Sequence, residues 1–413
     1  MIENFENKIN EYARILIKIG LRVEKGDTVV IEAPVECADF ARKCVTNAYD
    51  AGAKVVAVHW KDDFVTREKY LRADDEVFDT VPSNFVHLRN DYALEGASFL
   101  FLTGSDPSLL AGVDHDRIRR NTKACYQALD PFYKKQMSNE ITWCIAAVAG
   151  EKWARKVFPE KSASEAIDLL WEAIFETVRA KGDGDGCEKW IEHLDTLNKR
   201  ALQLNKYNFK SLHYTNSLGT DLVVELPEGH IWASGESKKP SGQGFTANMP
   251  TEEVFTAPLK TGVNGIVYAS KPLALNGNIV EDFYFVIKNG YIEEYHAAKG
   301  EEILKNELDM DAGSRFLGEV ALVPYDSPIS RQNILYFETL FDENASCHLA
   351  FGEAYPECLE GGLDMNEDEL ASHGLNTSKT HEDFMIGTRD LCITGTTHSG
   401  EEIPVFMDGN FVF

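Results

Sequence analysis

Six residues toward the C-terminal end of the chain have side chains of the kinds that bind divalent cations. His381 and Asp383 stand two positions apart in a segment whose pattern indicates a strand, so their side chains point to the same side of it. An imidazole and a carboxylate on one side suit zinc, cobalt or manganese. Separate segments supply the other candidates, and together they predict a metallohydrolase. The full set is Glu253, Glu319, Glu343, His348, His381 and Asp383.

Glu319 and His348 lie among apolar neighbours. Burying a carboxylate without a partner costs roughly several kcal/mol, so Glu319 must be paired or metal-bound, and a salt bridge with Arg315 is the alternative. A lone histidine at His348 would more often be a core residue than a ligand, but the company of Glu319 and of the strand pair favours a ligand. Glu253 follows Glu252 in a proline-framed loop, where two solvated acids are the alternative.

Two further observations narrow the chemistry. Tyr355 follows the segment of His348 and has a hydroxyl that can donate to a developing oxyanion, although an ordinary half-buried tyrosine is the alternative. His381-Glu382 opens the H-E-x-x-H pattern, but Met385 stands where the second histidine would be. This argues against a single-zinc site of the thermolysin type. The sequence also lacks a phosphate-binding loop and a dinucleotide fingerprint after its first strand, so nucleotide binding is not predicted.

The net charge limits the kinds of molecule that the protein is expected to bind. Asp and Glu number 67 against 41 Lys and Arg, a net charge of −26, which argues against nucleic acid and against an anionic membrane surface. An acidic protein attracts, weakly, a cationic substrate such as a peptide amino terminus. We find no signal-peptide pattern and no apolar run long enough to span a bilayer. The eight cysteines contain no C-x-x-C pair, and we expect a cytoplasmic protein.

Residues 1–186 are predicted to form an α/β domain with a parallel sheet. Apolar residues at helical spacing alternate with short buried strands, and the first strand, helix and strand have the length typical of a parallel pair. A helix is expected to open at Pro34 and to end at Gly52. The expected strands are 27–31, 54–60, 98–104 and 142–148, and the expected helices are 5–20, 34–52, 115–128 and 163–180.

Residues 187–413 are predicted to form an α+β domain rich in antiparallel strands. The glycine-punctuated segment 181–186 marks the boundary, although a helix over 188–206 leaves open on which side of it the domains divide. Short strands then alternate with turn signals, and Asn276-Gly277 and Asn289-Gly290 are expected hairpin turns. The expected strands are 210–214, 221–226, 279–287, 291–295 and 411–413, interrupted by helices at 299–309 and 332–340.

Four motifs, taken in order, resemble the aminopeptidase T / aminopeptidase S family of leucyl-type metallo-aminopeptidases. The resemblance extends over the whole chain and implies a homodimer with a co-catalytic pair of divalent ions in the C-terminal domain. The motifs are PTEEVFTAP at 250–258, GEVALV at 318–323, HLAFG at 348–352 and THEDFMIG at 380–387.

The same resemblance implies a role for each candidate. Glu319 bridges the two ions and counts among the catalytic residues. Glu343 is a ligand or the acid/base group, and Tyr355 is a catalytic tyrosine. Zinc or cobalt is expected, with manganese or magnesium as alternatives. The implied metal ligands are Glu253, Glu319, His348, His381 and Asp383.

Three functions compete on these observations. The favoured one is a metallo-aminopeptidase that removes the N-terminal residue from peptides with a free amino terminus. The alternative is a two-metal hydrolase of a non-peptide amide or ester, because the sequence does not fix the leaving group. A noncatalytic protein with a structural metal is the third. Glu343 and Tyr355 argue against it, since a structural site needs neither.

Overall fold

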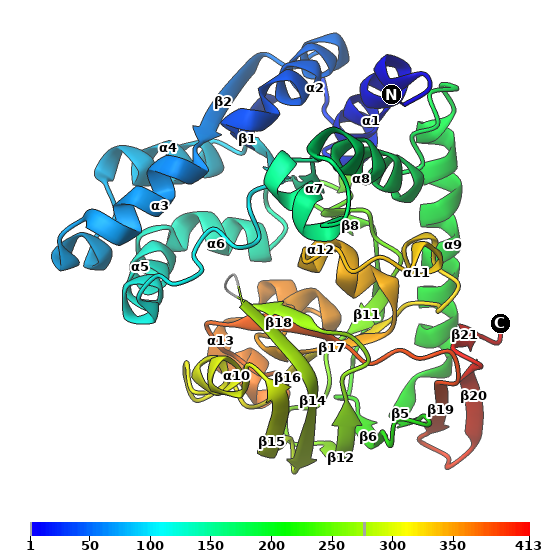
Figure 1. Ribbon diagram of the computed structural model, residues 1–413. Coiled ribbons are helices and arrows are strands. Elements are labelled where there is room, and N and C mark those ends of the chain that lie inside the picture. Colours follow the sequence, from blue (N-terminus) through cyan, green and yellow to red (C-terminus); the bar gives the residue numbers. More distant parts are fainter. Residues whose placement is uncertain (1, 276–277) are drawn as a thin grey trace. The chain divides into compact units, whose positions relative to one another are not determined.

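The computed structural model describes residues 2–275 and 278–413, and the chain divides into two compact units (Figure 1). The first is Met1–His193 with Glu236–Pro250, and the second is Leu194–Gly235 with Thr251–Phe413. The predicted domains, 1–186 and 187–413, differ from these units at two points. The division falls inside α9 (Gly186–Tyr207), and 236–250 belongs to the first unit. The reason is that β10 (Asn248–Met249) pairs with β4 (Trp143–Ala147), a tertiary pairing without a local sequence signal.

A five-stranded sheet forms the centre of the first unit, in the order β10-β4-β3-β1-β2. All of its pairings are parallel, which confirms the predicted parallel α/β layer. β1 (Thr28–Pro34) is buried along almost its whole length, as expected of a parallel strand covered on both faces. The neighbouring strands are β2 (Val55–Lys61) and β3 (Ser98–Thr103). A short pair, β8 (Ser237–Lys238) and β9 (Gly244–Phe245), completes the strands of this unit.

Eight helices among the described residues accompany this sheet. Gly52 ends α2 in the left-handed conformation, as predicted, and Ser162 with Glu165 forms a capping box at the start of α8. Pro34, expected to open a helix, instead ends β1 with extended dihedral angles. The helices are α1 (Phe5–Ile15, continued by a π-helical turn at Leu16–Gly20), α2 (Ala38–Ala51), α3 (Asp63–Arg72), α4 (Ser83–Leu94), α5 (His115–Ala128), α6 (Asp130–Met137), α7 (Glu151–Val157) and α8 (Ala163–Thr177).

Helices α3, α4, α6 and α7 have no counterpart in the sequence prediction. α3 shows the reason most clearly, because its apolar residues do not gather on one face. Phe64 and Val65 are exposed, at 70% and 62%, and the helix is set by the Asp62 side chain, which caps Val65 N–H at 3.0 Å. Because α3 has an N-terminal cap but no apolar face, the spacing of its apolar residues does not predict it.

Two antiparallel sheets build the second unit, which confirms the predicted α+β class. The five-stranded sheet has the order β18-β17-β16-β11-β7 and the nine-stranded sheet the path β13-β14-β12-β6-β5-β19-β20-β21, with β15 paired to β14. The first comprises β7 (Ala233–Ser234), β11 (Val254–Thr256), β16 (Leu317–Leu322), β17 (His348–Gly352) and β18 (His381–Met385). The second comprises β5 (Phe209–Thr215), β6 (Asp221–Glu225), β12 (Val263–Tyr268), β13 (Leu273–Leu275), β14 (Asn278–Lys288), β15 (Tyr291–Lys299), β19 (Cys392–Thr397), β20 (Glu402–Met407) and β21 (Asn410–Phe411).

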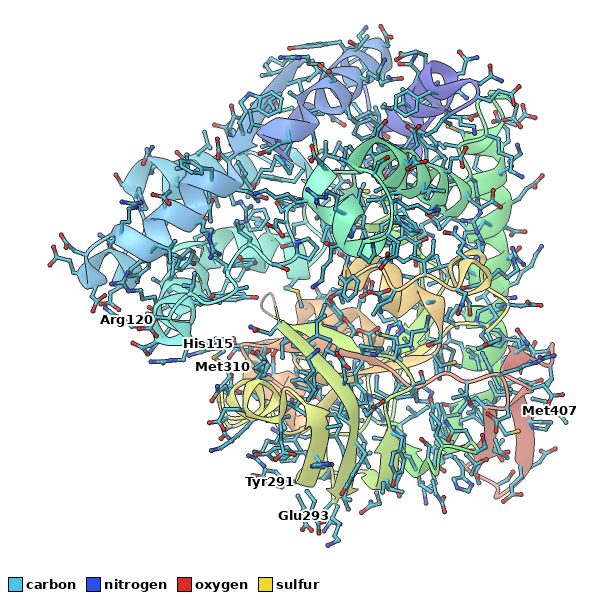
Figure 2. The ribbon with its side chains drawn as sticks, in the orientation of Figure 1. His115, Arg120, Tyr291, Glu293, Met310 and Met407 are labelled. Atoms are coloured by element: carbon cyan, nitrogen blue, oxygen red, sulfur yellow. The ribbon has the colours of Figure 1, made fainter. Side chains whose placement is uncertain are left out.

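The β14–β15 hairpin turns at Asn289 and Gly290, whose φ angles of 49° and 80° belong to a turn with two left-handed residues. This confirms one of the two expected turns; the other, Asn276-Gly277, lies outside the described residues. Figure 2 shows Tyr291 and Glu293 on β15 near this turn. The remaining helices of the unit are α10 (Glu301–Leu308), α11 (Pro328–Gln332), α12 (Thr339–Asp342) and α13 (Glu367–Ser372).

The helix predicted over 332–340 is wrong. α11 ends there, with Asn333 in the left-handed region at φ 51°, and α12 begins only at Thr339. Phe337, between them, also has a positive φ of 55°. Left-handed residues cannot continue a right-handed helix, and a sequence pattern does not reveal them when they are not glycine.

The core of the second unit lies between its two sheets. Val320, Leu349, Phe351 and Phe384 contribute one face of the five-stranded sheet, and each is completely buried. They pack with Phe285 on β14 and with other apolar residues of the large sheet. Alternation along each strand then directs the intervening residues to the opposite face. Among the described residues, every helix is too short or too polar to span a bilayer.

Candidate metal centre

The five predicted ligands all belong to the five-stranded sheet or its immediate approach. Glu253 directly precedes β11, Glu319 is in β16, His348 begins β17, and His381 and Asp383 lie in β18. These segments are far apart in the sequence and meet only through strand pairing. The sheet therefore assembles the predicted constellation.

Strand register places these side chains on one face. Glu319 pairs with Ala350, which pairs in turn with Asp383, and the three form a row across the sheet. Because residues two apart share a face, His348 lies on the same face as Ala350, and His381 on that of Asp383. Ala350 supplies only a methyl group between two carboxylates. A larger residue at position 350 would place its side chain between the two carboxylates.

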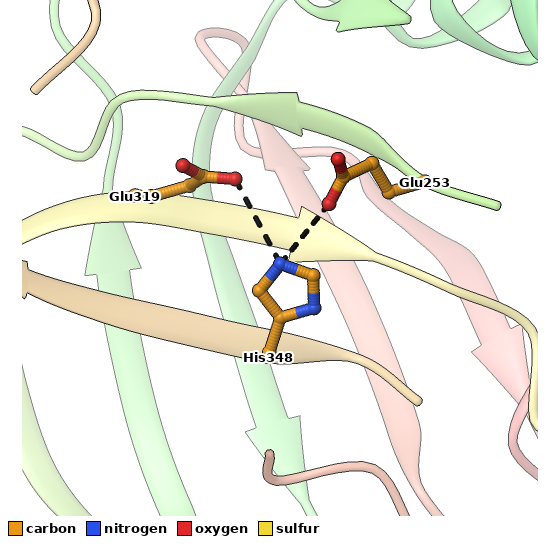
Figure 3. Close-up of side chains that lie close together, drawn as sticks. All are labelled: Glu253, Glu319 and His348. Atoms are coloured by element: carbon orange, nitrogen blue, oxygen red, sulfur yellow. Dashed lines mark ion pairs between the residues drawn. The ribbon is translucent and has the colours of Figure 1, made fainter. Parts of the chain in front are cut away.

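The first group consists of Glu253, Glu319 and His348 (Figure 3). The Nε2 atom of His348 is 3.1 Å from Glu253 Oε2 and 3.8 Å from Glu319 Oε1. All three residues are buried. One ligand atom from each lies within 4.8 Å of the others, a spacing that a single cation can bridge.

The second group consists of Glu319, His381 and Asp383. The Nε2 atom of His381 is 3.2 Å from Glu319 Oε2 and 3.6 Å from Asp383 Oδ1. Glu319 therefore belongs to both groups, with one carboxylate oxygen toward each histidine. The expected same-side placement of His381 and Asp383 is confirmed by this geometry.

Backbone carbonyls fix the orientation of both imidazoles. Nδ1 of His348 lies 3.2 Å from Ser346 O, and Nδ1 of His381 lies 2.7 Å from Glu353 O. A carbonyl oxygen only accepts, so each Nδ1 carries a proton and each Nε2 faces the carboxylates. An Nε2 atom in this position either carries a second proton, which it donates to a carboxylate, or gives its lone pair to a cation held between them. The same arrangement orients histidine ligands in metalloproteins.

Buried Asp383 Oδ1 has no hydrogen-bond partner among the described residues. It lies 3.9 Å from His348 Nε2 and 3.6 Å from His381 Nε2. A buried carboxylate oxygen without a donor is costly. The donor set of oxygen and imidazole nitrogen, and this orphaned atom, both fit a divalent metal ion.

Burial and mutual charge shift the protonation of the cluster. Burial raises the pKa of Glu253, and Glu319 and Asp383 add to this against an opposing hydrogen bond from His348. Burial lowers the pKa of His348, but its contacts with Glu253 and Glu319 raise it more, to well above its usual range. Burial also lowers the pKa of His381, but Tyr355, Asp383 and Glu319 raise it more, to well above its usual range. The cluster thus holds positive charge strongly, as protons or as metal.

Glu343 and Tyr355 lie beside these groups. Glu343 is buried, and burial followed by the charges of Asp383 and Glu253 raises its pKa well above the usual range. The Tyr355 ring is 4.9 Å from that of His381. The charge on His381 lowers the pKa of Tyr355, but burial and nearby carboxylates raise it more. The tyrosine therefore keeps its proton at neutral pH.

Two findings lie outside the sequence reasoning. Arg315, the alternative partner of Glu319, instead pairs with Asp309 at 2.6 Å. Glu353 was not singled out, although it holds the segment of His381 through three groups: its carbonyl meets Nδ1 of His381, its N–H donates to Thr380 O at 2.7 Å, and its carboxylate accepts from Ser378 N–H. An acid that acts mainly through its backbone gives no sequence signal.

The whole chain is similar to known proteins. Residues 5–411 match the family described as thermophilic metalloprotease (M29). Aminopeptidase AmpS of Bacillus subtilis is 46% identical over 412 residues, and aminopeptidase PepS of Streptococcus thermophilus is 43% identical over 414 residues, each with 100% of both chains covered. The solved structure of wild-type AmpT from Thermus thermophilus superposes with a TM-score of 0.92 at 38% identity, covering 99% of this chain and 100% of that one.

Fold, site and relatives together define a metal-dependent peptidase, and they do not favour a hydrolase of non-peptide amides or esters. The chain belongs to the thermophilic metalloprotease (M29) family. The resemblance to the aminopeptidase T / aminopeptidase S family is confirmed.

Proposed function

We propose that this protein is a metallo-aminopeptidase with a co-catalytic pair of divalent ions bridged by Glu319. The observation that supports it most directly is that Glu319 belongs to two groups of potential ligands, with one oxygen toward each histidine. Glu253 and His348 complete one ion site. His381 and Asp383 complete the other.

The donor set favours zinc or cobalt over manganese or magnesium. Each ligand group would offer its ion one imidazole nitrogen and carboxylate oxygens. Imidazole is a preferred ligand of zinc and other late first-row metals, whereas magnesium prefers oxygen alone. Five acidic and imidazole side chains also leave open positions for water and substrate, as a catalytic site requires.

The residues beside the ions supply proton transfer and oxyanion binding. Two bound ions would polarise the scissile carbonyl and lower the pKa of the attacking water. The charge of the bound ions would oppose the raised pKa of Glu343 and keep it ionised, so that it accepts the proton of that water and returns it to the leaving amine. We assign it the acid/base role because it is buried beside both ligand groups and belongs to neither. Tyr355, with its raised pKa, keeps the proton that it donates to the oxyanion.

The proposed substrates are peptides with a free amino terminus. The chain as a whole has a net charge of −26, and a free amine could also ligate one of the bound ions. An unblocked terminal amine fits this charge, whereas an acetylated terminus offers neither a cation nor a free amine. The relatives carry the name aminopeptidase, which agrees with this choice.

The test is hydrolysis of leucyl-p-nitroanilide by metal-stripped protein, alone and with zinc or cobalt added. N-acetyl-leucyl-p-nitroanilide is the matched control, because it differs only at the amine. We expect release that needs both metal and the free amine. Equal release from both compounds would contradict an aminopeptidase, and no release with any metal would contradict the proposed activity altogether.

We further propose a cytoplasmic homodimer. The resemblance to the family supports the dimer, and eight unpaired cysteines support a reducing compartment. Light scattering coupled to size-exclusion chromatography should give twice the mass of one chain. A monomer mass at micromolar concentration would contradict the dimer.

A further inference from the structure

Asn344 is a completely buried amide that touches both the acid/base candidate and the approach to a metal ligand. Its Nδ2 donates to Glu343 Oε1 at 3.2 Å and to Leu340 O at 3.0 Å. Its Oδ1 accepts from Glu252 N–H at 2.7 Å. One side chain therefore connects the Glu343 carboxylate with the backbone that leads directly into Glu253.

The surroundings of Asn344 fix which end of its amide faces Glu343. Leu340 O can only accept, and Glu252 N–H can only donate, so a flipped amide would break both bonds. The NH2 group must therefore point toward Glu343. The backbone is also anchored, because Asn344 O accepts from the Ser327 hydroxyl at 3.1 Å.

We propose that Asn344 is a positioning residue that holds the Glu343 carboxylate in its working orientation. This inference rests on the proposed function, in which Glu343 moves the proton. A carboxylate at the end of a glutamate side chain has rotational freedom that a fixed N–H donor removes. The donor also favours the ionised form that accepts a proton. The same amide accepts a hydrogen bond from the backbone of Glu252, which directly precedes Glu253. Asn344 therefore fixes the position of the Glu343 carboxylate relative to the segment of Glu253.

A purely structural amide would need only its two backbone bonds. The bond to Glu343 is a third contact, and it is directed at a group with a proposed chemical task. The two interpretations predict different kinetics. Loss of a positioning bond lowers kcat with bound metal intact, whereas loss of a structural bond lowers metal content and stability together.

The first variant is Asn344→Asp, which has the same shape. One oxygen still accepts from Glu252 N–H, but the other presents a lone pair to Glu343 and to Leu340 O, where Asn344 has a donor. We expect kcat on leucyl-p-nitroanilide to fall about a hundredfold, as misplacement of a catalytic group does, while KM and bound metal stay within about threefold. If this variant does not accumulate as folded protein, Asn344→Ala provides the kcat measurement.

A reciprocal swap tests the contact without any activity. In Asn344→Asp with Glu343→Gln, the donor moves to position 343 and the hydrogen bond can form again. We expect part of the thermal midpoint lost in Asn344→Asp to return in the double variant, because the bond to residue 343 is restored and the bond to Leu340 O is not. Activity stays absent because the carboxylate at 343 is gone. A double variant no more stable than Asn344→Asp would overturn the contact.

Ser327→Ala is the matched control. It removes the hydroxyl bonded to Asn344 O but leaves the amide contacts intact, so kcat should stay within about threefold of the wild type. The inference is overturned if Asn344→Asp and Asn344→Ala keep wild-type kcat, or if they lose metal in proportion to activity. A wild-type protein that is inactive with every metal overturns the proposed function and, with it, the kinetic role of Asn344. The thermal midpoints of Asn344→Asp and of the double variant still test the contact in that case.

Discussion

Replacing Glu319 by glutamine should weaken both proposed metal sites at once. The substitution keeps the size of the side chain and removes one negative charge. That charge lies between the two histidines, with Oε1 3.8 Å from His348 Nε2 and Oε2 3.2 Å from His381 Nε2. No other residue belongs to both ligand groups found in the described part of the chain.

The magnitude follows from charge and distance. Two unit charges about 4 Å apart interact by about 4 kcal/mol at an effective dielectric constant of about 20, and a divalent ion doubles this. The amide oxygen of glutamine still ligates through its dipole, which offsets part of the loss. We therefore expect each ion to bind about 4 kcal/mol more weakly, or about a thousandfold in Kd.

Isothermal titration of metal-stripped protein with zinc measures this directly. Glu382→Gln is the matched control, because burial raises the pKa of Glu382 to about 8, so the wild-type residue is already mostly uncharged at neutral pH. The control should bind zinc like the wild type. Two zinc ions bound to Glu319→Gln with wild-type affinity would refute the shared role of Glu319, and loss of only one ion would refute the bridge.

Three further outcomes are expected. Tyr355→Phe should lower kcat by about 10²–10³ with metal content unchanged, because an oxyanion donor is lost; unchanged kcat in steady-state assays would exclude that role. The pKa values of His348 and His381 lie well above their usual range, so metal binding to the neutral rings should release protons and strengthen as pH rises, measurable by titration in buffers of different ionisation enthalpy. Zinc affinity independent of pH would contradict this. In the first unit, Glu32→Gln should lower the free energy of unfolding by about 3 kcal/mol by leaving Arg89 without its buried partner. Burial raises the pKa of Glu32, but Lys61 and Arg89 lower it more, so this stability is present above its usual pKa and the difference from wild type should shrink as pH falls below about 4 in urea unfolding. A difference that grows on acidification would show that the ion pair is not its source.

The fold class followed from the sequence because its signals are local. Helical spacing of apolar residues, short buried strands and turn dipeptides each act within about one element, and together they indicate a parallel first half and an antiparallel second half. The pairing of β10 with β4 is not local. This pairing places residues 236–250 in the first unit. A prediction with a single domain boundary in the sequence cannot include such a return of the chain.

The sequence by itself determined the candidate ligands and the placement of one pair among them. Alternation along a strand is sufficient to put His381 and Asp383 on one side, and the ordered motifs identified the family. Tertiary structure decided how these candidates combine. The register of three strands places Ala350 between Glu319 and Asp383, and this register depends on contacts among segments far apart in the chain. Carbonyl oxygens of Ser346 and Glu353 orient the imidazoles, and the amide of Asn344 reaches Glu343 and Glu252. The carbonyl contacts use backbone atoms, which carry no residue identity, and the amide contacts depend on how the chain packs, so a sequence pattern reveals neither.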